Sequence, residues 1–301
     1  MSTARESNRA TVGRIRQRLW HEGSARGARL AAFLETATGG LAGKRVLDLG
    51  CAEGGITQVL AERSGFAVGL DNRPENVEAA GRRLGGGDER LVGFVRGNAL
   101  RLPFATGSFD VVLMSGLLEW MGFAMPDRDP GEAQRETLRE VLRVLAPRGA
   151  IFVGIENRWF PKFLLRSPHL HLPLVMMLPN RLVWALPRWL VRQRVHERLY
   201  GERALRHLFE DVGFVDPVVY LPLFDYQFPR EVVRGDDRTG LLEALHRTSG
   251  PPSDDFEVVA GGGRWGRRWM RLIATFGAAR WLAPCLIVAG RKVAEGDSAD
   301  A

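Results

Sequence analysis

The chain has 301 residues, 45% of them hydrophobic and 26% charged, a composition typical of a globular protein that buries a large core. Its formal net charge is +7, which suits nucleic acid, anionic lipid or an acidic substrate as partner, and which also occurs throughout arginine-rich proteomes. Two distant cysteines argue against a disulfide framework. The lack of a signal-peptide core or of an apolar run near ~18 residues argues against secretion and membrane spanning, so we expect a cytoplasmic protein.

The first half of the chain alternates predicted strands and helices. Residues 1–43 form an N-terminal helical segment, with one or two helices over 11–38. Short apolar runs predict strands over 46–49, 66–71, 91–99, 109–116 and 149–157, and helical spacing predicts helices over 56–64, 74–84 and 132–145. Strands that alternate with helices in this way form a parallel sheet that helices cover on both faces.

This alternation ends at residue 157. Residues 158–199 are rich in Leu, Pro, Trp and Arg without strand alternation, and residues 225–280 are irregular. Between and after these blocks we predict a helix over 201–214 and strands over 218–223 and 285–292. Because a strand follows each block, we interpret the blocks as insertions, at about 158–199 and 225–284, in one domain over 44–293 with a disordered tail over 294–301.

Residues 46–55 read VLDLGCAEGG, a short apolar strand that runs through a glycine-rich turn into a helical segment. Strand, glycine turn and helix open a nucleotide-binding βαβ unit. Gly50, Gly54 and Gly55 carry no side chains, so a ligand can approach the backbone. Asp71 ends the next strand, 21 positions after Gly50, as expected of a carboxylate that accepts from ribose hydroxyls. A plain tight turn and a helix-capping role for Asp71 are the alternatives.

The position of Asp48 in the sequence argues against a nicotinamide-binding site. It lies inside the first strand, before the glycines, where a carboxylate would repel a pyrophosphate. The sulfonium and amino group of S-adenosylmethionine suit this negative charge. The position of Asp48 therefore favours S-adenosylmethionine as the ligand.

Three ordered segments resemble class I S-adenosylmethionine-dependent methyltransferases: VLDLGCAEGG, GNALRLPFATGSFDVVLMSGLLEW and LRVLAPRGAIFVGIENR, over about residues 44–157. The resemblance implies an α/β fold: a doubly wound, Rossmann-like, seven-stranded and mostly parallel sheet with helices on both faces, the last strand antiparallel, plus cap insertions. It implies S-adenosyl-L-methionine as cofactor. We expect no metal site, because the sequence has no His/Asp/Glu spacing typical of metal ligands. The matching cofactor-binding positions are Asp48, Gly50, Cys51, Ala52, Glu53, Gly54, Asp71, Asn72, Asn98, Ala99 and Ser115.

Each group of these positions has a role in the resemblance. The loop that begins at Asp48 would hold the methionine part, Asp71 and Asn72 the ribose, Asn98 and Ala99 the adenine, and Ser115 would lie beside the methyl group. Two positions depart from the pattern. Ala52 stands where a middle glycine is frequent, and Asn98 stands where an aspartate is usual, which removes a charge from the adenine contact.

The second half resembles, over short motifs, methyltransferases of bacterial cell-surface polysaccharide synthesis: GIENRW, YGERALRHLFEDVGF and PLFDYQFPREVV. This implies transfer to a hydroxyl of a glycan, a glycolipid, a lipid-linked acceptor or another small molecule. A hydroxyl acceptor benefits from a general base. The catalytic residue is unknown from the sequence, and the candidates are Glu119, Glu156, His169 and His171.

Three other functions stay open. The basic charge suits a nucleic-acid methyltransferase, although the fourth strand leads into SGLLEW without an Asn/Asp-Pro-Pro-Tyr type of segment, which argues against nucleic acid. A non-catalytic cofactor-binding protein and a Rossmann oxidoreductase are the others.

Residues 170–194 mix Leu, Met, Trp and Arg and are divided by prolines, so they cannot form one spanning helix. Either the apolar side chains pack on the domain and the arginines are solvated, or this segment makes a peripheral contact with the inner face of the membrane. In the second case Trp184 and Trp189 would lie at the interface.

Overall fold

The computed structural model describes residues 23–83, 91–165, 174–184, 195–223, 225–226, 229–248 and 264–294. Its contacts divide the chain into two compact units, Met1–Gly97 and Asn98–Ala301. Residues 1–22, which include part of the predicted helical segment, and residues 295–301 of the predicted tail lie outside the described residues.

The first unit is built on a parallel sheet with the strand order β3-β2-β1. Its strands are β1 (Arg45–Leu49), β2 (Phe66–Asp71) and β3 (Val92–Arg96). Its helices are one over residues 23–38, α2 (Gly55–Arg63) and α3 (Pro74–Arg83). Four of the five β1 residues are buried, as expected of a continuous apolar run in a strand covered on both faces. α3 begins at Pro74, where the missing N–H costs nothing.

The second unit has the strand order β4-β5-β8-β6-β7. These strands are β4 (Phe109–Ser115), β5 (Leu145–Glu156), β8 (Cys285–Arg291), β6 (Val215–Pro222) and β7 (Val232–Arg234). β4 and β5 are parallel, whereas β8 is antiparallel to both of its neighbours, which confirms the predicted antiparallel last strand. The described residues contain eight strands, so the predicted seven-stranded sheet was wrong by one. The extra strand is β7, too short to show an alternating pattern.

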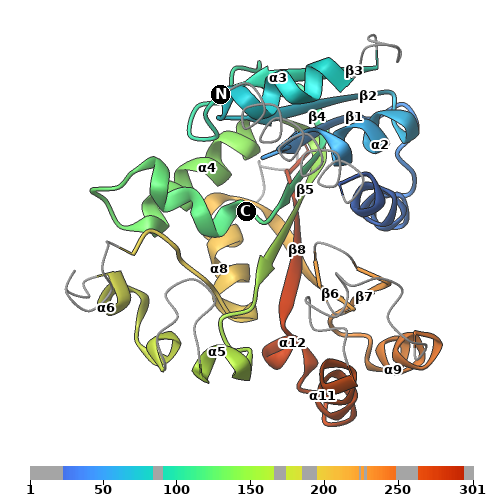
Figure 1. Ribbon diagram of the computed structural model, residues 1–301, viewed down its shortest axis with the longest axis vertical. Coiled ribbons are helices and arrows are strands. Elements are labelled where there is room, and N and C mark those ends of the chain that lie inside the picture. Colours follow the sequence, from blue (N-terminus) through green and yellow to red (C-terminus); the bar gives the residue numbers. More distant parts are fainter. Residues whose placement is uncertain are drawn as a thin grey trace, which may run out of the picture. The chain divides into compact units, whose positions relative to one another are not determined.

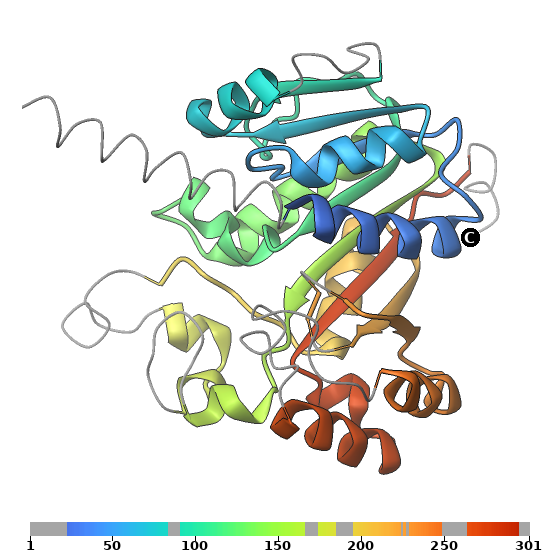
Figure 2. The same cartoon turned by 45° about the vertical axis from the view of Figure 1, so that its right-hand side comes forward.

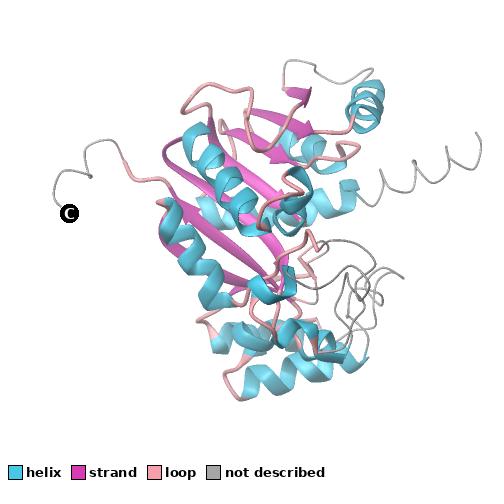
Figure 3. Ribbon diagram, turned by 90° about the vertical axis from the view of Figure 1, so that its left-hand side faces the viewer, coloured by secondary structure: helices cyan, strands magenta, loops and turns pink. Residues whose placement is uncertain are grey.

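The second unit also contains helical elements, some beside its strands and some beyond the strand ends. The helical elements are η1 (Leu118–Ala124), α4 (Pro130–Val144), α5 (Pro161–Leu165), η2 (Val175–Met177), α6 (Asn180–Trp184), α8 (Glu202–Val212), α9 (Arg238–Arg247), α11 (Arg264–Thr275) and α12 (Ala279–Leu282). Figure 1 shows α5, α11 and α12 beyond the lower ends of β5 and β8. Figure 3 shows helices lying against the strands and a further group of helices beyond one end of them. The block that the sequence left irregular thus contains β7, α9 and α11. Within the described ranges, no helix combines the length and apolar character needed to cross a bilayer.

Candidate functional site

The glycine-rich turn after β1 has a left-handed backbone at three positions. Gly50 has a φ of 84°, Ala52 of 47° and Gly54 of 82°. Glycine adopts this conformation without steric cost, but Ala52 carries a Cβ and is strained there. The Ala52 N–H donates to Oδ2 of Asp71 at 3.0 Å, so the end of β2 holds the turn after β1 in shape.

Gly54 and Gly55 are small because the protein itself fills the space around them. A Cβ on Gly54 would overlap the ring of Phe94 in β3 and lie 3.0 Å from Ala80 Cβ in α3. A Cβ on Gly55 would lie 2.9 Å from the backbone of Gly23, in the helix over 23–38 that runs beside α2 (Figure 2). The role of Gly54 in holding the cofactor stays a prediction, but a side chain here would not lie in open space. It would enter the space of Phe94.

Asp48 is buried in β1 with one strong hydrogen bond. The Thr57 hydroxyl of α2 donates to its Oδ2 at 2.6 Å. Burial raises the pKa of Asp48 to about 6, and the Thr57 hydrogen bond and the charge of Arg26 act in the opposite direction. Asp48 is therefore mostly ionised at neutral pH and presents a negative charge in a poorly solvated place, as the prediction of a cationic ligand group requires.

Asp71 connects two parts of the first unit. Its Oδ1 accepts from the Arg73 N–H at 2.9 Å and from Nδ2 of Asn76 at 3.1 Å, and its Oδ2 accepts from Ala52. A carboxylate offers about four acceptor sites, so about one stays available for a ribose hydroxyl. The capping alternative is therefore real, and the ribose role stays a prediction. The neighbouring Asn72 is exposed.

Two other predicted loop residues have partners within the first unit. Cys51 is buried, and burial raises the pKa of its thiol well above the usual range, so this thiol is unreactive. The carboxylate of Glu53 pairs with Arg83 of α3. The Glu53–Arg83 pair joins the glycine turn to the end of α3.

The second unit carries the remaining predicted cofactor residues. Asn98 is exposed and its Oδ1 accepts from the Leu100 N–H at 3.0 Å, while Ala99 is buried. Ser115 ends β4, and its hydroxyl oxygen is buried without a hydrogen-bond partner in the structure. Buried hydroxyls are usually paired, so Ser115 is a place where a ligand atom would complete the bonding.

A buried carboxyl group lies just after β4. Glu119, in η1, is 1% exposed. Its Oε1 accepts from the Tyr226 hydroxyl at 3.4 Å, and its Oε2 is buried without a hydrogen-bond partner among the described residues. Burial, together with the charge of Glu156 at the end of β5, raises the pKa of Glu119 to about 8. A carboxyl group with this pKa can exchange a proton near neutral pH.

Tyr226 is the residue that the sequence reasoning missed. Its ring fills the side-chain space of two glycines: a Cβ on Gly116 would lie 2.8 Å from Oη, and a Cβ on Gly154 would lie 2.7 Å from Cδ2. Gly116 follows β4 and Gly154 lies in β5. The ends of two parallel strands and a segment from the second insertion therefore meet around Glu119. The only local signal was the motif FDYQF, which does not reveal this contact.

Comparison with known proteins identifies the domain. Residues 47–153 match the family model described as a methyltransferase domain. The chain is 34% identical over 116 residues to a demethylmenaquinone methyltransferase of Lactococcus lactis subsp. lactis, covering 38% of this chain and 42% of that protein. It is 33% identical over 112 residues to norajmaline N-methyltransferase of Rauvolfia serpentina, covering 36% and 35%. Residues 47–153 thus have the sequence pattern of a methyltransferase domain.

These two matches cover less than half the length of either curated relative. The structure of the [4+2]-cyclase SpnF is similar to the chain with a TM-score of 0.50 at 18% identity, covering 88% of this chain and 80% of that one. This likeness shows the fold alone. The predicted Rossmann-like α/β methyltransferase fold is confirmed, with eight strands instead of seven.

The cofactor of the methyltransferase domain is S-adenosyl-L-methionine, as predicted. Two features fit it: the ionised, buried Asp48, suited to a positively charged group, and the unpaired Ser115 hydroxyl. The individual contacts of the predicted positions stay predictions. Among the described residues, no cluster of His, Cys, Asp and Glu could hold a metal ion.

Of the other base candidates, Glu156 lies near enough to Glu119 for its charge to act on it, and the two histidines, His169 and His171, lie outside the described residues. Asn157, which follows Glu156 at the end of β5, uses its side chain in hydrogen bonds that hold the fold. Its Nδ2 donates to the carbonyls of Trp281 and Ala283 at 2.9 Å, and its Oδ1 accepts from the Trp159 N–H at 3.1 Å.

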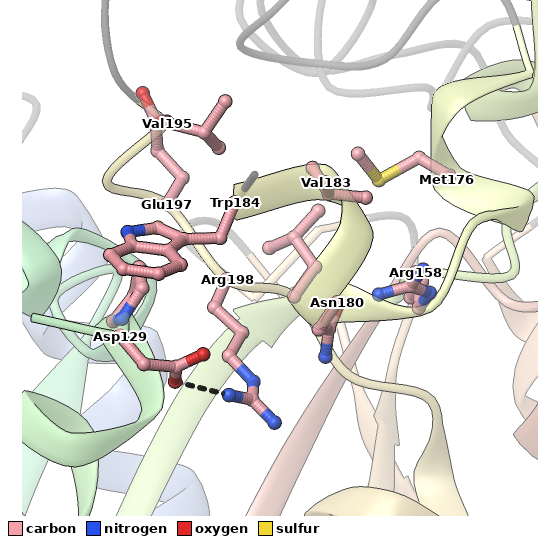
Figure 4. A pocket seen from close by; sticks show the side chains of 11 residues that line it. Asp129, Arg158, Met176, Asn180, Val183, Trp184, Val195, Glu197 and Arg198 are labelled. Carbon is pink, nitrogen blue, oxygen red and sulfur yellow. Dashed lines mark hydrogen bonds and ion pairs between the residues drawn. The ribbon is translucent and has the colours of Figure 1, made fainter. Parts of the chain in front are cut away.

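A pocket lies between the start of α4 and the first insertion of the methyltransferase domain (Figure 4). Its lining residues are Asp129, Pro130, Arg158, Met176, Asn180, Val183, Trp184, Val195, Glu197, Arg198 and Leu199. Asp129 and Arg198 form an ion pair at 2.6 Å. The Arg198 N–H donates to the Glu119 carbonyl at 3.2 Å, so the pocket wall joins the segment that carries the buried acid.

The polar groups in this pocket are only partly satisfied. Arg158 is 6% exposed and donates to the Leu178 carbonyl, but no described carboxylate pairs with it. Nε1 of Trp184 and Oε2 of Glu197 are buried and have no hydrogen-bond partners in the described part of the chain. Trp184, which the membrane hypothesis placed at an interface, thus lines a pocket, and Trp189 lies outside the described residues.

Proposed function

We propose that the protein transfers the methyl group of S-adenosyl-L-methionine to a hydroxyl of a glycan, a glycolipid or another small molecule, with Glu119 as general base. One observation carries the proposal: a buried carboxyl group, bonded to Tyr226 and close to Glu156, stands just after β4 with its pKa raised to about 8. The bound cofactor would supply an electrophilic methyl group on a sulfonium. The residues of this chain would orient the acceptor and receive its proton.

Glu119 suits a hydroxyl acceptor because a hydroxyl is a poor nucleophile until its proton is removed. A base is most effective when its pKa lies near the working pH, and a pKa of about 8 meets this condition. The Tyr226 hydroxyl donates to Oε1, which leaves Oε2 to accept from the acceptor. The repulsion between Glu119 and Glu156 favours a state in which the pair carries one negative charge.

The pocket beside η1 supports one class of acceptor. Met176, Val183 and Val195 give it apolar walls, and the buried Arg158 gives it a cationic group without a carboxylate partner among the described residues. An acceptor with an apolar part and an anionic group, such as a sugar linked to a phosphate, matches both. This supports a nucleotide-linked or lipid-linked glycan within the proposed class.

The alternative functions predict different products in a methyl-transfer assay. A nucleic-acid methyltransferase is favoured only by the net charge of +7. A non-catalytic protein would bind cofactor without turnover, and SpnF, which shares the fold, is named for a cyclisation. The reaction therefore has to be measured directly, because one fold serves several chemistries.

The deciding experiment uses methyl-labelled S-adenosylmethionine and a cell extract fractionated into lipid, polysaccharide, RNA and small molecules. We expect wild-type protein to place label as a base-stable methyl ether in a glycan, lipid or small-molecule fraction. The Glu119→Gln variant should bind cofactor and transfer little label. Label found only in RNA, or equal transfer by Glu119→Gln, would refute the proposal.

A further inference from the structure

Helix α11 is apolar on two opposite faces. Met270, Ile273 and Ala274 are at most 3% exposed and pack into the second unit. On the other side, Trp265 is 58% exposed, Leu272 50% and Phe276, just past the helix end, 76%. A surface helix normally hides its apolar stripe and shows polar residues to water, so a second, exposed apolar stripe needs a partner.

The exposed stripe continues onto α12. Trp281 is 48% exposed, and the guanidinium of Arg280 lies 5.1 Å from its ring. Figures 1 and 2 both show α11 and α12 side by side at the lower end of the second unit. Trp265 stacks on Trp269 with ring centroids 6.0 Å apart. We call this surface the arginine–tryptophan face, made of Trp265, Arg268, Leu272, Phe276, Arg280 and Trp281.

The charge on this part of the chain has a single sign. Residues 264–282 contain five arginines and no aspartate or glutamate. Arg268 and Arg271 are exposed, and Arg268 lies one helical turn before Leu272, on the same side of α11. Exposed tryptophan and phenylalanine flanked by arginines is the composition of helices that lie in a membrane interface, with the rings among the head groups and the cations against anionic lipid.

We propose that the arginine–tryptophan face docks the protein onto a membrane that contains anionic lipids. The arginines give attraction at a distance, and the apolar side chains then enter the interfacial layer. Leu272 favours lipid over nucleic acid, because an aliphatic side chain neither stacks on a base nor pairs with phosphate. This contact differs from the one predicted for residues 170–194, which expose Leu174, Met177 and Leu182.

The inference is independent of the proposed methyl transfer, because its readout is lipid binding. Sedimentation would use vesicles of phosphatidylcholine alone and vesicles with about one third phosphatidylglycerol, at low and high salt. We expect wild-type protein to sediment with the anionic vesicles only, and to be released by salt, which screens charges beyond ~10 Å at 0.1 M.

Two double variants and one control locate the contact. Arg268→Glu with Arg280→Glu, and Leu272→Ser with Phe276→Ser, should each weaken vesicle binding by about tenfold or more. The control, Arg203→Glu with Arg206→Glu, removes the same charge from α8 and should bind nearly as wild type does. Circular dichroism melting of each variant checks that it is folded.

Several outcomes would overturn the docking proposal. Wild-type protein that stays in the supernatant at low salt would do so, as would folded variants of the arginine–tryptophan face that bind as wild type does. Equal loss in the α8 control would mean that only net charge matters. If RNA competes for the same face and phosphatidylglycerol vesicles do not bind, the surface is a nucleic-acid contact and the proposal fails.

Discussion

Glu119 should determine the pH dependence of methyl transfer. With its pKa raised to about 8 by burial and by Glu156, the base form grows as the pH rises through this value. We expect kcat/KM for the acceptor to rise with pH up to about 8 and then to level off. In Glu119→Gln this rise should vanish and kcat should fall by about 100-fold or more, while cofactor affinity is kept. Glu156→Gln serves as the matched variant and should move the midpoint to lower pH.

The Glu119 carboxyl group should make the folded state less stable at high pH. The pKa of Glu119 is raised from 4.5 to about 8, so the folded state holds this proton more tightly than the unfolded state. Its contribution to the free energy of unfolding is complete below about pH 4.5 and is lost as the pH rises through about 8. Denaturant melts between pH 5 and 8 should show a smaller decline for Glu119→Gln than for wild type. Parallel declines would mean that the carboxyl group is not buried as described.

Replacing Ala52 with glycine should stabilise the folded protein. Its φ of 47° costs a residue with a Cβ roughly 1–2 kcal/mol, and the greater chain entropy of glycine takes back part of the gain. Ala52→Gly should therefore raise the free energy of unfolding by about 0.5–1 kcal/mol in denaturant melts. The control is Ala61→Gly in α2, where the same change should destabilise by about 1 kcal/mol.

Asp71 should affect both the fold and cofactor binding. Asp71→Asn keeps the size of the side chain but removes the charge that strengthens its bonds to Ala52 and Arg73. Loss of a charge-assisted hydrogen bond is worth about 1.5–3 kcal/mol, so calorimetry should show cofactor affinity about tenfold weaker. Asn72→Ala, at an exposed neighbour, should change stability little. Unchanged affinity in folded Asp71→Asn would remove the ribose assignment and leave the capping role.

At the scale of elements, the packing of the helix over 23–38 on α2 depends on Gly55. A Cβ there would lie 2.9 Å from the backbone of Gly23 and Ser24, which cannot yield as a side-chain tip can. Gly55→Ala should therefore destabilise the protein by about 1–3 kcal/mol, as overpacking does. Gly81→Ala in α3 is the control, since no atom lies within 4 Å of its Cβ position. It should stabilise by about 0.5–1 kcal/mol. Similar effects at both glycines would contradict the packing.

For the whole molecule, ligand linkage separates the cofactor classes. A ligand present at about 100 times its dissociation constant stabilises the folded protein by about 2.7 kcal/mol. S-adenosylmethionine should therefore raise the melting temperature by several degrees in a thermal scan, and NAD should leave it unchanged. A rise with NAD alone would favour the oxidoreductase alternative. Salt should not abolish the effect of S-adenosylmethionine, because the buried Asp48 is poorly screened.

Local signals in the sequence determined a large part of this protein. The strands β1, β2 and β4 are runs of apolar residues, and such runs predict buried strands without knowledge of their neighbours. The glycine turn, Asp48 and Asp71 lie close together in sequence, so their spacing indicates a nucleotide-type site. The antiparallel last strand came from the family resemblance. β7 was not predicted, because three residues are too few to show the alternating pattern of a strand.

Only the tertiary structure decided which residues meet. The hydrogen bond between Tyr226 and Glu119 joins positions 107 residues apart, and no local pattern encodes such a contact. The sequence shows that Gly54 and Gly55 have no side chains, but not that Phe94 and Gly23 occupy the space where such side chains would lie. Trp184 looked interfacial and lines a pocket, while α11 was not predicted as a helix at all. In each case side-chain type and spacing follow from local sequence, whereas burial and pKa depend on atoms that distant segments bring together.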